Sequence, residues 1–72
     1  MRFVFRRDDV MKVRDAIKLI EHDGWYRIKA KGGHRQYKHL AKPGRVTVSG
    51  QMNAELDKKT EKSILKQADL AD

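Results

Sequence analysis

Three histidines are the side chains of this sequence that could accept or release a proton near neutral pH, because an imidazole has an unperturbed pKa of about 6.5. They are His22, His34 and His39. His34 directly follows two glycines in a segment rich in lysine and arginine, where a negatively charged group could approach it. His22 falls where a helix should end, and His39 should be partly buried and hydrogen-bonded. His34 is therefore the first candidate for catalysis and His39 the second.

A helix is expected before this region. Its apolar residues recur at positions i, i+3, i+4 and i+7, namely Val13, Ala16, Ile17 and Ile20. Charged side chains occupy the other positions, which is typical of an amphipathic helix. Gly24 ends it, because glycine tolerates the backbone conformation that follows a helix.

A β-hairpin should carry His34. Residues 25–31 alternate, with Tyr26, Ile28 and Ala30 expected on the core side. Gly32 and Gly33 supply the positive φ angles that a two-residue turn requires, so residues 34–39 form the second strand.

The rest of the chain predicts a third strand and a second helix. Lys42-Pro43-Gly44 indicates a turn, and the β-branched run 45–48 follows it. A helix capped by Asp57 or Thr60 should extend to about Ala68. The expected fold is α+β, a two-layer αβββα sandwich with two helices on one face of a three-stranded antiparallel sheet.

The register of the hairpin predicts which side chains share the face of His34. A Gly32-Gly33 turn places Lys31 opposite His34, and residues directly opposite one another share a sheet face. The solvent-exposed face of the sheet should then carry one imidazole among polar and cationic groups: Arg27, Lys29, Lys31, His34, Gln36, Lys38 and Arg45. A solvated sheet face is also ordinarily polar and lysine-rich, so this pattern alone has a structural interpretation.

The charge of the whole chain favours a polyanionic partner. Among its 72 residues, 17 are Lys or Arg and 10 are Asp or Glu, for a formal net charge of +7. Nucleic acid is the first candidate, and an acidic protein or a membrane surface would satisfy the same charge. The chain has no cysteine and no long apolar run, so we expect a cytoplasmic protein of a single domain without disulfides or a membrane span.

RNA is the nucleic acid on which one histidine could act. Its 2′-hydroxyl is an internal nucleophile, so cleavage needs a base, an acid and cations for the phosphate, and neither a metal nor another cofactor is obligatory. Lys29, Lys31, Arg35 and Lys38 are candidates for stabilising the phosphate charge. The residues themselves leave open whether such a chain cleaves RNA or only binds it.

Several segments resemble a known family. They are Met11-Lys12-Val13-Arg14-Asp15-Ala16-Ile17-Lys18-Leu19-Ile20-Glu21, Asp23-Gly24-Trp25, Lys31-Gly32-Gly33-His34, Gln36-Tyr37-Lys38-His39, Lys42-Pro43-Gly44-Arg45-Val46-Thr47-Val48 and Ser63-Ile64-Leu65-Lys66-Gln67-Ala68. In this order and spacing they resemble the HicA toxins of HicAB toxin–antitoxin systems.

The resemblance implies a fold like that of double-stranded-RNA-binding domains and ribonuclease activity on messenger RNA (an mRNA interferase). The histidine after the glycine turn is the family's catalytic residue, which corresponds to His34 here. The resemblance also implies a HicB-like antitoxin that covers this site. The chain should be a monomer alone and part of a hetero-oligomer with that partner.

The sequence departs from the family at five places. Gly33 stands where serine is frequent, Arg35 where a second histidine is common, and Ser49-Gly50 where His-Pro is frequent. Glu61 replaces an apolar residue of the last helix, and Asp69 replaces its terminal glycine.

Residues 1–10 precede the region of resemblance. We expect them to be an N-terminal extension and residues 11–72 to be the toxin-like domain. Phe3-Val4-Phe5 could form an added edge strand, a partner contact or a loose tail. A non-catalytic RNA-binding module and a domain that only docks an acidic antitoxin are the alternative functions.

Overall fold

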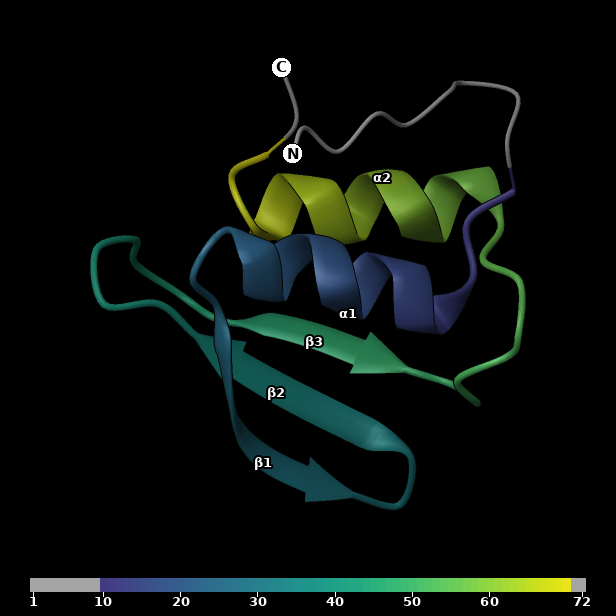
Figure 1. Ribbon diagram of the computed structural model, residues 1–72, viewed down its shortest axis with the longest axis horizontal. Coiled ribbons are helices and arrows are strands. Elements are labelled where there is room, and N and C mark those ends of the chain that lie inside the picture. The colour runs from purple at the N-terminus through teal and green to yellow at the C-terminus, as the bar shows by residue number, and fades with distance from the viewer. Residues whose placement is uncertain (1–9, 71–72) are drawn as a thin grey trace.

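The computed structural model describes residues 10–70, so the expectation for Phe3-Val4-Phe5 lies outside the described residues. The elements follow the order α1 (Val13–His22), β1 (Tyr26–Lys31), β2 (His34–Lys38), β3 (Val46–Ser49) and α2 (Lys58–Gln67). The strands form an antiparallel sheet in the order β1-β2-β3, and both helices lie on one side of it, next to β3 (Figure 1). The predicted αβββα fold is confirmed.

The core lies between the helices and the β2–β3 half of the sheet. The predicted stripe of α1 is buried, and Tyr37, Val46 and Val48 meet it from the sheet. The buried apolar residues are Met11, Val13, Ala16, Ile17, Ile20, Trp25, Tyr37, Val46, Val48, Ile64 and Ala68. Because the helices contact β3 and each other, the core closes on that side of the sheet.

The strand β1 lies outside this core. All six of its residues are exposed, including Tyr26 at 44% and Ile28 at 42%, so their expected place in the core is wrong. The helices lie next to β3, and the β1 edge of the hairpin extends beyond them (Figure 1). Trp25, directly before β1, is 2% exposed and anchors the hairpin to the core instead.

The hairpin register is regular near the turn and irregular farther away. Lys31 pairs with His34, as predicted, and Lys29 pairs with Gln36. A bulge at Ile28 then shifts the register, because one extra residue in β1 reverses the faces of the residues beyond it. Arg27 consequently pairs with Tyr37, and Tyr26 pairs with Lys38.

The second helix begins at a side-chain cap. The Asp57 carboxylate accepts a hydrogen bond from the backbone N–H of Thr60 at 2.7 Å, so Asp57 rather than Thr60 is the cap of the two that the sequence offered. Glu61, in the first turn of α2, is only 8% exposed and lies 3.9 Å from the Lys58 ammonium. No helix within residues 10–70 is long and apolar enough to cross a membrane.

Candidate nucleic-acid interface

The face of the sheet opposite the helices is open to solvent. Register and alternation place three rows of side chains on it: two run from β1 through β2 to β3, and the third joins β1 to β2. These rows are Lys31–His34–Ser49, Lys29–Gln36–Thr47 and Tyr26–Lys38. Gln36 is half-buried and the other members are exposed. We call this surface the open face.

His34 lies at the centre of the first row, at the start of the middle strand. The turn before it uses positive φ at both glycines, +56° at Gly32 and +82° at Gly33, as the predicted two-residue turn requires. The N–H of Gly50 donates to the Gly33 carbonyl at 3.3 Å, which ties the turn to the end of β3. Within residues 10–70 the His34 ring makes no hydrogen bond or ion pair, so both ring nitrogens are available to a ligand.

Arg45, directly before β3, extends the open face past the start of that strand. Its guanidinium donates to the Gln36 side-chain oxygen at 3.0 Å, so it reaches back over the sheet toward the second row. The amide of Gln36 keeps its own N–H donors for a ligand. This hydrogen bond holds the Arg45 guanidinium at Gln36, which lies two residues after His34 in β2.

Among residues 10–70, the open face carries four cations and no carboxylate. The cations are Lys29, Lys31, Lys38 and Arg45. Opposite residues in antiparallel strands lie about 5 Å apart. Lys31 stands opposite His34 in the first row, and Lys29 lies in the second row, opposite Gln36. A phosphate in contact with the imidazole would therefore meet at least one ammonium, an arrangement that positions a nucleic-acid backbone.

Two predicted nucleic-acid-binding residues lie on the other side of the sheet. Arg27 was expected on the same sheet face as His34, but the bulge at Ile28 places it opposite the buried Tyr37. Arg35 pairs with Val48, which is also buried, so it faces the helix side. The expected place of Arg27 on the face of His34 is therefore wrong, and Arg35 lies on the side of the sheet away from His34. Tyr26 takes a place on the open face that strict alternation had not given it.

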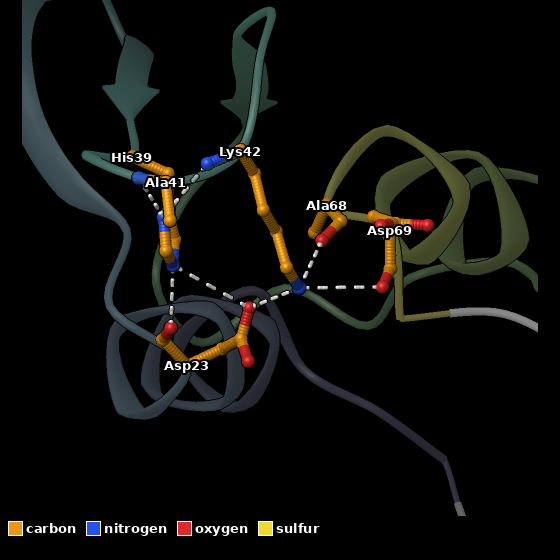
Figure 2. Close-up of polar contacts among 6 residues, drawn as sticks. All are labelled: Asp23, His39, Ala41, Lys42, Ala68 and Asp69. Atoms are coloured by element: carbon orange, nitrogen blue, oxygen red, sulfur yellow. Dashed lines mark hydrogen bonds and ion pairs between the residues drawn. The ribbon is translucent and has the colours of Figure 1, made fainter.

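His39, the second catalytic candidate, has a structural role. Its Nδ1 accepts hydrogen bonds from the backbone N–H groups of Ala41 and Lys42, at 2.9 and 3.1 Å. Its Nε2 therefore carries the proton and donates to the Asp23 carbonyl at 2.7 Å (Figure 2). The ring also meets Trp25 edge-on, with centroids 5.3 Å apart. With both nitrogens occupied and 13% of the side chain exposed, the predicted partly buried, hydrogen-bonded histidine is confirmed.

Lys42 joins the same region to the second helix. Its ammonium lies 2.5 Å from the Asp23 carboxylate and also donates to the carbonyls of Ala68 and Asp69, at 3.2 and 3.3 Å (Figure 2). One cation thus connects the end of α1, the β2–β3 loop and the end of α2. From the sequence, Lys42 was expected only in a turn, because nothing local indicates where its flexible side chain ends.

No cluster of metal-ligating side chains is formed within the described range: residues 10–70 contain no group of three or more His, Cys, Asp or Glu side chains that could hold an ion. The open face instead offers an imidazole, cations and an amide. These groups can transfer a proton and bind an anion.

Comparisons with known proteins show the family of the chain. A family model described as the HicA toxin of bacterial toxin–antitoxin matches residues 13–70. A solved structure described as a toxin–antitoxin complex from Streptococcus pneumoniae contains a chain with 31% identity and a TM-score of 0.67. The match covers 83% of this chain and 98% of that chain. A comparison with curated protein sequences found no match. The chain therefore belongs to the HicA family of toxins from bacterial toxin–antitoxin systems.

Proposed function

We propose that this HicA-family toxin is an endoribonuclease of the mRNA interferase type, in which His34 is the catalytic residue. The observation that carries the proposal is an exposed imidazole without a protein partner in residues 10–70, on a sheet face with four cations and no carboxylate. An imidazole placed in this way can exchange protons with a phosphodiester that the cations hold.

The proposed reaction uses the RNA's own 2′-hydroxyl as nucleophile. His34 removes its proton as the 2′ oxygen forms a bond to phosphorus. The bond from phosphorus to the 5′ oxygen breaks, and the imidazolium returns the proton to that leaving oxygen. The products are a 2′,3′-cyclic phosphate and a 5′-hydroxyl, and no other reactant is consumed. The protein's contribution is one shuttled proton and stabilisation of the phosphorane charge.

The cations of the open face would stabilise that charge. Lys31 lies directly opposite His34, and Lys29 lies in the next row. Lys38 and Arg45 extend the positive surface along the strand, where they would hold the neighbouring phosphates of a single strand. Gln36 would orient the backbone through its amide N–H groups. Gly32 and Gly33 hold His34 at the start of β2 and need no contact with RNA.

We also propose an acidic antitoxin of the HicB type as the partner, acting with the toxin in the cytoplasm, where messenger RNA is translated. The similar solved chain comes from a toxin–antitoxin complex. A partner that covers the open face would exclude RNA from His34, and a net charge of +7 favours an acidic surface. The toxin would be monomeric when released.

The test compares His34→Ala with His22→Ala. His22 is an exposed histidine at the end of α1, away from the open face, and serves as the matched control. Loss of general acid–base catalysis should lower the rate of RNA cleavage about 10²-fold or more. The assay is a gel of labelled RNA in buffer with chelator, with circular dichroism to show that both variants are folded. Wild-type cleavage by folded His34→Ala would refute the proposal.

A non-catalytic RNA-binding module is the second candidate. It is favoured by one observation, that Ser49 lies directly across from His34, so within residues 10–70 the first row contains no second imidazole. Such a module would bind RNA with strong salt dependence and yield no product in the same gel assay. Cleavage that His34→Ala abolishes would exclude it.

A further inference from the structure

A groove lies on the helix side of the β1–β2 hairpin, on the opposite side of the sheet from His34. It has a volume of about 380 Å³ and opens to solvent between α1 and the projecting hairpin. Its lining residues come from α1, both hairpin strands and the loop after β3: Ile17, Glu21, Arg27, Arg35, Tyr37 and Met52. The groove exists because β1 extends beyond the helical layer.

Two guanidinium groups in this groove have no acceptor among residues 10–70. Arg35 Nη1 is buried and has no hydrogen-bond partner in the described part of the chain. Arg27, across the hairpin, makes no hydrogen bond or ion pair within residues 10–70. A buried donor without an acceptor lowers stability, so a ligand that brings an oxygen to Arg35 would recover that loss. Guanidinium groups match the planar, two-oxygen geometry of a carboxylate.

The charges in the groove act on one another. Burial raises the pKa of Tyr37, Glu21 raises it further, and Arg27 and Arg35 oppose the rise. All four groups therefore lie within electrostatic reach, and the two arginines and one glutamate leave a net charge of +1. A single negative charge would neutralise the groove.

The remaining lining distinguishes between classes of occupant. Ile17 and Met52 are apolar, and Met52 is 45% exposed at the rim. A protein side chain can place one carboxylate on a flexible stem at Arg35 while an apolar neighbour covers these two residues. A phosphodiester carries a ribose on each side and would have to lay a polar backbone over them. The lining therefore favours protein over RNA.

We propose that this groove is a docking site for an acidic segment of a partner protein. One Asp or Glu carboxylate of that segment binds between Arg27 and Arg35, and an adjacent apolar side chain packs on Ile17 and Met52. The site lies on the opposite side of the sheet from the open face and depends on neither catalysis nor His34. A partner could thus hold the toxin from the helix side while another of its surfaces covers the open face.

The test is a nuclear magnetic resonance titration of the intact chain with the peptide acetyl-Leu-Glu-Leu-amide. Backbone and arginine side-chain signals of Ile17, Arg27 and Arg35 should shift in a saturable way. The matched peptide with Gln in place of Glu should bind about tenfold more weakly or worse, because it cannot form the charged hydrogen bonds.

Two groove variants and one control complete the experiment. Arg35→Met and Arg27→Met should each raise the Kd for the Glu peptide about tenfold or more. If one variant does not fold, the other still tests the groove. Lys62→Met removes an exposed cation of α2 and should leave the Kd unchanged.

Three results would overturn the proposal. The first is equal binding of the Glu and Gln peptides, and the second is signal shifts confined to the His34 side of the sheet. The third is saturable shifts at Arg27 and Arg35 caused by a 2′-O-methyl RNA oligonucleotide, which would assign the groove to nucleic acid. None of these results depends on RNA cleavage, so failure here is distinct from failure of the nuclease proposal.

Discussion

Replacing Gly24 with alanine should destabilise the protein through a clash with His39. Gly24 has φ +109°, and a Cβ added there would lie 2.7 Å from His39 Nε2. The ring cannot move away freely, because Nε2 donates to the Asp23 carbonyl and Nδ1 accepts from two backbone N–H groups. Gly24→Ala must therefore displace a histidine that three hydrogen bonds hold.

The size of the effect follows from two costs. A positive φ at alanine costs about 1–2 kcal/mol, and each hydrogen bond weakened by moving the ring costs about 1 kcal/mol. If one to three of the bonds weaken, the expected loss is about 2–5 kcal/mol of unfolding free energy, against about 4–11 kcal/mol for a domain of this length. Gly44→Ala is the control, because Gly44 has φ +82° and a Cβ there meets nothing within 4 Å. It should lose only the backbone part.

Urea unfolding followed by the fluorescence of Trp25, the chain's one tryptophan, measures both variants. A double-mutant cycle isolates the clash: in a His39→Ala background, Gly24→Ala should cost only about 1–2 kcal/mol, because the ring is gone. Equal costs of Gly24→Ala in the presence and absence of the His39 ring would refute the reasoning. So would a Gly24→Ala variant as stable as the parent chain.

Three further predictions concern the other polar groups of the fold. Lys42→Met should cost about 1–2 kcal/mol in urea unfolding, because the Asp23 carboxylate and two helix-end carbonyls lose their shared donor; Lys62→Met, an exposed control, should cost much less. Burial, with Glu21 adding to the effect, raises the pKa of Tyr37 above 10.0. The protonated Tyr37 side chain therefore contributes its full stability below about pH 10, and this contribution is lost as the pH rises through the pKa of Tyr37 in the folded protein. Tyr37→Phe should accordingly lose less stability in alkali than the parent. The Thr60 N–H lowers the pKa of Asp57 below 3.8. The ionised Asp57 carboxylate contributes stability above pH 3.8, and this contribution is lost as the pH falls through the lower pKa of Asp57 in the folded protein. Asp57→Asn keeps a cap but does not titrate, so its unfolding with falling pH, followed by circular dichroism, should be less steep than that of the parent.

The elements of the fold were predictable because each has a local cause. The 3.6-residue stripe from Val13 to Ile20 gives α1, and Asp57 gives the start of α2. The glycine pair fixes the turn, and the turn fixes the partner of His34. The exposure of His34 could therefore be read from residues within a few positions of it.

Several side chains of β1 were placed wrongly because their faces depend on contacts between strands and helices, which the alternation of residues in the sequence does not indicate. Nothing in the run from Tyr26 to Lys31 indicates that Ile28 forms a bulge, because the bulge depends on how β1 meets β2 across the sheet. Nor does the pattern indicate that β1 extends beyond the helices, since this depends on where the helices pack. Trp25 was the usable signal, because a tryptophan directly after a helix exit and before a polar strand favours burial of the tryptophan.

The bulge at Ile28 decides how the cations of the hairpin are divided. Without it, Arg27 would share the open face with Lys29 and Lys31, and the groove would hold one guanidinium against the carboxylate of Glu21. With it, the lysines remain beside His34 and both arginines face the groove. The two cationic surfaces then lie on opposite sides of one sheet, so no single phosphate or carboxylate can contact both. RNA cleavage and binding of an acidic partner in the groove should accordingly be separable by mutation, even though both depend on the same two strands.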